Sequence, residues 1–103
     1  MYSRVTLLEI DTVRIDLKEA VARFREEVVP GLKQQDGYDG CVVLTTPEGK
    51  AMLITCWETE EAVDAAAGFA AGELERFMLL FSSPPGREHY EVAFLELPEG
   101  AVR

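Results

Sequence analysis

The order of apolar and polar positions along the chain predicts alternating strands and helices. Residues 4–10 are predicted to form a strand. A helix is expected to begin at Asp16, because Glu19 stands three positions later in a capping-box pattern. Pro30 is expected to end or kink this helix, since proline has no backbone N–H to donate. Between them, apolar residues recur at the spacing of one helical face: Leu17, Ala20, Val21, Phe24 and Val28.

Two neighbouring apolar segments, residues 41–46 and 51–57, are predicted to form a β-hairpin. A two-residue loop at residues 48–49 would place Cys41 directly opposite Cys56. In a reducing environment we expect this pair to be small buried thiols rather than a disulfide.

The second half of the chain repeats the alternation. Thr59 is predicted to cap a helix, a second short helix covers residues 74–81, and a last strand covers residues 88–97. The resulting order, βαββαβ, is that of an α+β, ferredoxin-like subunit with an antiparallel sheet and helices on one face. Residues 1–103 are predicted to form a single domain, with a core over about residues 4–97 and a loose tail at 98–103.

Both faces of the predicted sheet are apolar. In the hairpin, Val42 and Leu44 point to one face, and Val43 and Met52 point to the other. Helices can cover only one face of such a sheet. We therefore predict a homodimer in which two sheets pack face to face. The alternative is a monomer with a contiguous exposed apolar patch, which soluble proteins rarely tolerate.

Charge and composition narrow the partners. The chain has 103 residues and a formal net charge of −9, which disfavours nucleic acid and anionic membrane surfaces as partners. No apolar stretch approaches the length of a membrane span, and the first residues lack a secretory-signal pattern, so a cytoplasmic protein is expected. Two cysteines and one histidine are too few for a Cys/His zinc site, so no metal is expected.

Four short segments, Val29–Lys33, Gly37–Gly40, Gly49–Ala51 and Trp57–Ala62, together resemble the antibiotic biosynthesis monooxygenase (ABM) family of the dimeric α/β-barrel superfamily. The resemblance extends over nearly the whole chain. It implies ferredoxin-like subunits paired into a dimeric α/β barrel, each with a cavity between helices and sheet. Some members oxygenate quinol- or anthrone-like aromatic compounds without a cofactor, and others degrade haem.

The resemblance also singles out residues. Trp57 matches the family's tryptophan at the end of the third strand. Leu53 and Val63 stand where catalytic oxygenases carry an asparagine and a tyrosine, and Arg76 is a loose counterpart of a helical arginine. Haem-degrading members use an asparagine and a helical histidine. This chain has no asparagine, and its only histidine, His89, lies in the last predicted strand. The resemblance therefore favours quinol oxygenation over haem degradation.

Each candidate site residue has two interpretations. His89 is the candidate catalytic base, because the ordinary pKa of histidine lies nearest neutrality; a surface position is the alternative. Trp57, Phe69 and Phe77 are candidate walls of an apolar pocket for a small aromatic ligand, and the alternative is core packing. Arg76 would hold an anionic oxygen of the ligand, or it is a solvated charge.

The sequence thus favours a cofactor-independent monooxygenase acting on a quinol- or anthrone-like compound. A non-catalytic ligand-binding or structural dimer of the same fold is the alternative, because Leu53 and Val63 are apolar where the catalytic pattern is polar. A cyclase-type isomerase, which would consume substrate without O₂, is a third hypothesis.

Overall fold

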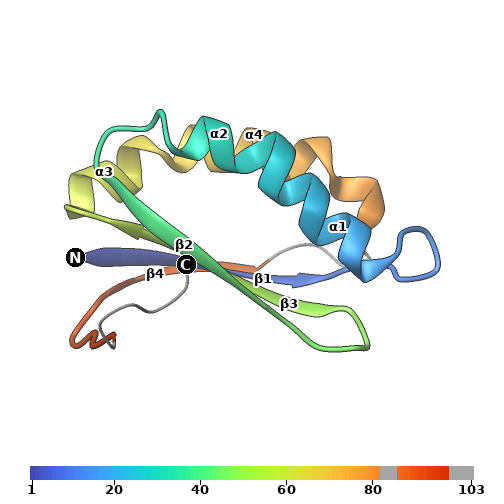
Figure 1. Cartoon of the computed structure of the whole chain (residues 1–103). Helices are drawn as coiled ribbons and strands as arrows, with labels where there is room; N and C mark the ends of the chain where they lie inside the picture. Colours follow the sequence, from blue (N-terminus) through green and yellow to red (C-terminus); the bar gives the residue numbers. More distant parts are fainter. Residues whose placement is uncertain (82–85, 98–103) are drawn as a thin grey trace.

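A four-stranded antiparallel sheet carries a layer of helices on one face (Figure 1). The computed structural model describes residues 1–81 and 86–97, without the side chains of residues 87 and 89. The sheet order is β2-β3-β1-β4, formed by β1 (Tyr2–Glu9), β2 (Tyr38–Thr45), β3 (Lys50–Trp57) and β4 (Gly86–Glu91). This arrangement confirms the predicted ferredoxin-like βαββαβ fold.

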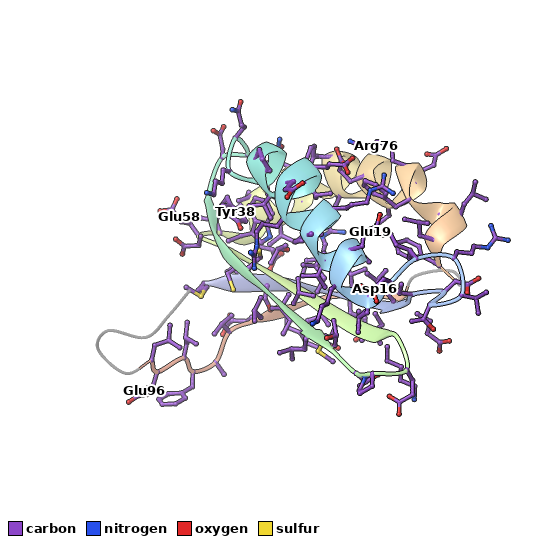
Figure 2. The ribbon with its side chains drawn as sticks, turned by 45° about the vertical axis from the view of Figure 1, so that its right-hand side comes forward. Asp16, Glu19, Tyr38, Glu58, Arg76 and Glu96 are labelled. Atoms are coloured by element: carbon purple, nitrogen blue, oxygen red, sulfur yellow. The ribbon has the colours of Figure 1, made fainter. Side chains whose placement is uncertain are left out.

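The first helical segment runs through three consecutive elements: α1 (Leu17–Arg23), the π-helix η1 (Phe24–Val28) and α2 (Val29–Leu32). Asp16 and Glu19 lie at its start (Figure 2). Asp16 occupies the N-cap position, but its side chain makes no capping hydrogen bond, so the predicted capping box is wrong. Pro30 does not end the helix. The wider π turn comes just before it, where a proline would otherwise crowd the preceding turn of an α-helix.

The second helical segment is formed by α3 (Glu60–Ala65), α4 (Ala67–Arg76) and the 3₁₀ turn η2 (Met78–Leu80). The Thr59 cap is confirmed, because its hydroxyl oxygen accepts a hydrogen bond from the Ala62 N–H at 3.1 Å. The break between α3 and α4 falls at Ala66. Ala66 is buried and belongs to the core cluster, so the break between the two helices packs against the sheet.

The predicted register of the hairpin is wrong by one residue. Its loop spans residues 47–49, and Gly49 adopts a φ of 98°, which favours glycine. The Thr46 N–H donates to the Lys50 carbonyl oxygen at 2.9 Å, closing this longer loop. Cys41 therefore lies opposite Thr55 rather than Cys56, and the two free cysteines are on opposite faces of the sheet.

The last strand is shorter and starts earlier than predicted. It covers Gly86–Glu91, and residues 92–97 have no regular secondary structure. Phe94, Leu95 and Leu97, which lie within the predicted strand of residues 88–97, are outside β4 and exposed. The predicted loose tail at 98–103 lies outside the described residues.

The two faces of the sheet have different surroundings. The face under the helices contains the core, a cluster of Val28, Leu32, Trp57, Val63 and Ala66. The open face carries exposed apolar side chains from three strands: Leu7, Val42, Leu44 and Tyr90. None of the described helices has the length and apolar character needed to cross a membrane.

Candidate functional site

A cavity of about 110 Å³ lies between the helical layer and the sheet. Its walls come from β1 and β3 below and from α1, η1, α4 and η2 above. Small residues from three of these elements, Ala20, Ala51 and Ala70, line it and leave room where larger side chains would fill the core. Most other lining residues are apolar: Leu8, Ile10, Val21, Phe24, Val28, Leu53, Leu74, Phe77, Leu80 and Phe81.

Trp57 forms one wall of this cavity and is also part of the core. Its side chain is 1% exposed, and its indole N–H donates to the Thr55 hydroxyl oxygen at 2.9 Å. The Tyr38 ring meets it edge to face, with ring centroids 5.5 Å apart. The ring is therefore held in a fixed orientation, as a rigid wall for a flat ligand requires. Both interpretations of Trp57, core packing and cavity wall, describe its position.

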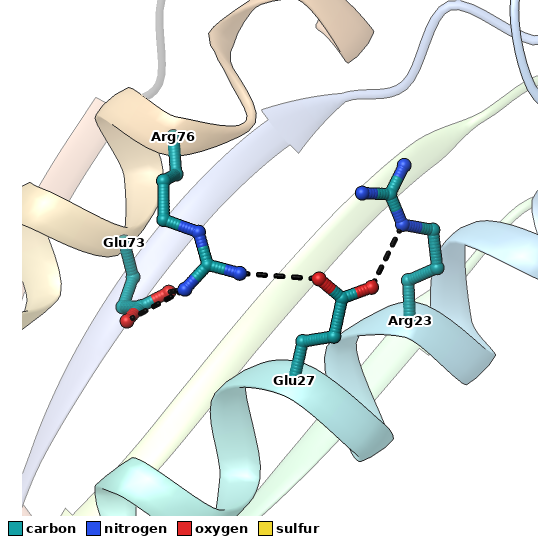
Figure 3. A network of polar contacts seen from close by, with 4 residues as sticks. All are labelled: Arg23, Glu27, Glu73 and Arg76. Atoms are coloured by element: carbon teal, nitrogen blue, oxygen red, sulfur yellow. Dashed lines mark hydrogen bonds and ion pairs between the residues drawn. The ribbon is translucent and has the colours of Figure 1, made fainter.

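Phe77 lines the cavity from the helical side, where charged side chains surround it. The Arg23 and Arg76 guanidinium carbons lie 5.1 and 4.8 Å from the centre of its ring. Both arginines bind Glu27, from Arg23 Nε at 2.9 Å and from Arg76 Nη2 at 3.1 Å (Figure 3). Arg76 also binds Glu73 at 2.9 Å. This network joins η1 to α4 across the top of the cavity.

Two predicted pocket residues are not among those that line the cavity. Arg76 is half-exposed and engaged in the ion pairs just described; Figure 2 shows it in the helical layer, away from the sheet. Phe69 packs beside the core, and its ring lies so close to Gly31 that a Cβ there would be 2.5 Å from the Phe69 Cζ atom. The structure gives these two side chains ion-pair and packing contacts.

The candidate base is placed only through its backbone. His89 pairs with Arg4 across β4 and β1, and Arg4 lines the cavity. The His89 side chain lies outside the described part of the structure.

Polar residues on the sheet were missed by the sequence reading. Arg4, Thr6 and Thr55 all line the cavity from β1 and β3. Arg4 and Thr6 alternate with Val5 and Leu7, a pattern that would normally place the polar pair in solvent. In the structure the polar pair faces the helices, and Leu7 is exposed on the open face. The alternation therefore separated the two faces of β1, but the sequence did not show which of them the helices cover.

The protonation state of Tyr38 and the arrangement of possible metal ligands limit the reactions that the site can support. Burial raises the pKa of the Tyr38 phenol well above its ordinary value, so Tyr38 stays protonated at neutral pH and is not a base. Within the described residues, no group of three His, Cys, Asp or Glu side chains is arranged to hold a metal ion. The site can therefore offer enclosure, a flat aromatic wall and a few hydrogen-bond donors.

Comparison with known proteins gives the fold a context. No family model matches the chain. An uncharacterized protein of Mycobacterium tuberculosis, Rv2558, is 29% identical over 96 residues, which cover 92% of this chain and 40% of that protein. The chain thus spans about two fifths of the length of the curated relatives that it matches.

Solved structures resemble the chain over almost its whole length. The protein NE2512 of unknown function from Nitrosomonas europaea superposes with a TM-score of 0.72 at 22% identity, covering 96% of this chain and 95% of that one. The ActVA-Orf6 monooxygenase of Streptomyces coelicolor, solved with the ligand Nanaomycin D, gives 0.72 at 17% identity, covering 95% and 92%. Further structures with this fold are named antibiotic biosynthesis monooxygenases. The chain has the fold of the antibiotic biosynthesis monooxygenases.

Proposed function

We propose that this chain binds a small aromatic compound in the cavity and oxygenates a quinol-like one without a cofactor. The observation that carries the proposal is the almost wholly apolar cavity between sheet and helices, with Trp57 and Phe77 among its walls. An apolar cavity of about 150 Å³ can hold benzene. The cavity of this chain is smaller, at about 110 Å³, so it would enclose no more than one aromatic ring, and the rest of an anthrone-like compound would lie outside it.

Membership of the antibiotic biosynthesis monooxygenase family belongs to this proposal, and the shared fold supports it. The proposal also includes a cytoplasmic homodimer in which the open faces of the two sheets are in contact. The exposed apolar side chains of that face, Leu44 and Leu7 among them, support such a contact. The curated relatives are longer than this chain, so the proposed activity is that of the domain formed by these residues.

The proposed reaction needs only the substrate, O₂ and a base. A quinol loses a phenolic proton, for which His89 is the proposed acceptor, and the resulting quinolate donates electrons to O₂. One oxygen atom forms a new C–O bond on the ring, and the O–O bond breaks. The second oxygen leaves as water with two hydrogens. A dihydroquinone and O₂ thus give a hydroxyquinone and water, with all four electrons supplied by the substrate.

Oxygen uptake tests this proposal. Purified protein would be mixed with hydroquinone or a dihydroxynaphthalene in the presence of a metal chelator, and O₂ consumption compared with spontaneous oxidation. We expect faster uptake with the protein, and lower turnover for His89→Ala and Trp57→Phe. Val13→Ala is the control, because Val13 is exposed in the loop after β1. Uptake no faster than the spontaneous rate would contradict the oxygenase proposal.

A non-catalytic ligand-binding dimer is the second candidate. Leu53 lines the cavity and Val63 is fully buried, so neither position offers the polar group expected of a catalytic oxygenase. This candidate predicts that quinols bind without O₂ uptake and are recovered unchanged. A cyclase-type isomerase would instead consume its substrate without O₂.

A further inference from the structure

Strand β1 presents two polar side chains to the cavity. Arg4 and Thr6 are two positions apart, so they share the face of β1 that lies under the helices, and both line the cavity. The register places Thr55 beside Arg4 and Leu53 beside Thr6. The sheet end of the cavity is therefore polar over a small area, while the walls around it are apolar.

Thr6 is only 3% exposed, and it lines the cavity from β1. On the neighbouring strand β3, the Thr55 hydroxyl oxygen accepts a hydrogen bond from the Trp57 indole N–H. The cavity is the space from which a ligand atom would reach the Thr6 hydroxyl.

Arg4 adds a positive charge at the same end. Its Nη2 donates to the Val63 carbonyl oxygen at 3.2 Å, which anchors the side chain against α3. A guanidinium always carries its positive charge and presents its N–H donors in one rigid plane. The other charged lining residues, Arg23 and Glu73, are on the helical side, where they form ion pairs with Glu27 and Arg76.

We infer that the sheet end of the cavity is a subsite for an ionised oxygen on an aromatic ligand, with Arg4 supplying the charge and Thr6 donating a hydrogen bond. The inference rests on the proposed binding of an aromatic compound and names its chemical class: a phenolate or an aromatic carboxylate. A guanidinium in an apolar cavity favours the ionised form of a bound phenol. The subsite would thus hold a quinol as its quinolate, the form that reacts with O₂.

Two probes of almost the same shape test the subsite. 4-Nitrophenol has an ionisable oxygen, and 4-nitroanisole carries a methyl group on that oxygen. Binding of each would be measured by calorimetry, and the ionisation of bound 4-nitrophenol by its absorbance across a pH series. The variants are Arg4→Met, which removes the charge, Arg4→Lys, which keeps it, and Thr6→Val, which removes the hydroxyl at similar volume.

The wild-type protein should bind 4-nitrophenolate about 10-fold or more tightly than 4-nitroanisole, and bound 4-nitrophenol should ionise at a lower pH than the free dye. Arg4→Met should weaken phenolate binding about 10- to 100-fold and return the ionisation to the pH of the free dye. Thr6→Val should weaken phenolate binding less, and Arg4→Lys should keep most of the preference. Binding of 4-nitroanisole should be unchanged in all three, which also shows that the variants are folded.

Equal affinity of the wild-type protein for the two probes would overturn the subsite. So would variants at Arg4 and Thr6 that bind 4-nitrophenolate as the wild type does, or that lose both probes equally. If Arg4→Met does not fold, the wild-type preference and Thr6→Val decide the question. Because these binding measurements involve no consumption of O₂, the oxygenase proposal can fail while the subsite stands. Failure of the subsite leaves the oxygen-uptake experiment unaffected.

Discussion

Replacing Leu44 on the open face of the sheet should weaken the proposed dimer. Leu44 is 52% exposed, so a second sheet would remove about half of its side chain from water. Complete burial of a leucine side chain is worth about 1.5–3 kcal/mol, which gives about 1 kcal/mol for each Leu44. A two-fold symmetric interface contains the residue twice, so the pair contributes about 2 kcal/mol.

Leu44→Ala should therefore raise the dissociation constant of the dimer about 30-fold. Leu44→Glu should raise it further, because it adds a charge that the apolar face cannot pair. Sedimentation equilibrium over a dilution series measures these constants. Val13→Glu is the matched control: it adds the same charge at a residue that is 94% exposed in the loop between β1 and α1. The reasoning is refuted if Leu44→Glu dimerises like the wild type, or if Val13→Glu is weakened as much.

Three further predictions concern stability and reactivity. Gly31→Ala should destabilise the fold by about 1–3 kcal/mol in urea unfolding, because the new Cβ would meet the Phe69 ring. Gly68→Ala adds its Cβ in open space on a helix and should stabilise the fold by up to about 1 kcal/mol. Equal effects of the two substitutions would contradict the packing argument. The hydrogen bond from Arg23 lowers the pKa of the Glu27 carboxyl in the folded protein. The ionised Glu27 carboxylate therefore stabilises the fold above the pKa that Glu27 has in the unfolded chain, and this stabilisation is lost as pH falls through the lower pKa that it has in the folded protein. Glu27→Gln should therefore reduce the loss of thermal stability between neutral pH and about pH 3, and a melting series with an unchanged acid limb would count against it. Burial, with a smaller effect of the Asp39 carboxylate, raises the pKa of the Cys56 thiol; iodoacetamide should therefore alkylate it more slowly in the folded protein than in urea at the same mildly alkaline pH, and a faster reaction when folded would be the opposite result.

The topology was readable from the sequence because each element carried a local signal. The spacing of apolar residues after Asp16 and the Thr59 cap marked the helices, and the turn at residues 47–49 marked the hairpin. The register was not readable in the same way, because the sequence is compatible with a loop of two residues as well as with one of three. A two-residue type I′ loop needs a positive φ at both of its residues, whereas in the structure Gly49 has one and Glu48 does not. The longer loop shifts the register by one residue and places Cys41 opposite Thr55.

The candidate site was predicted in part. Aromatic residues in a helix or at a strand end were recognised, and Trp57 and Phe77 do line the cavity. Phe69 was grouped with them because its type and position in the chain are similar, yet it packs against Gly31. Whether an aromatic side chain of this helical segment lines the cavity or packs elsewhere depends on which side of the segment faces the sheet. Arg4 and Thr6 escaped because polar residues on a strand are normally solvated, and only the packed structure shows that their side of β1 is the covered one.

Titration of the isotope-labelled protein with 4-nitrophenol, followed by backbone amide NMR shifts, tests the ligand cavity most directly. The account predicts that the largest shifts fall on residues lining the cavity, including Thr6, Thr55 and Phe77, with little change at Leu44 on the open face. Shifts concentrated around Leu44, or no saturable shifts at the cavity, would contradict it.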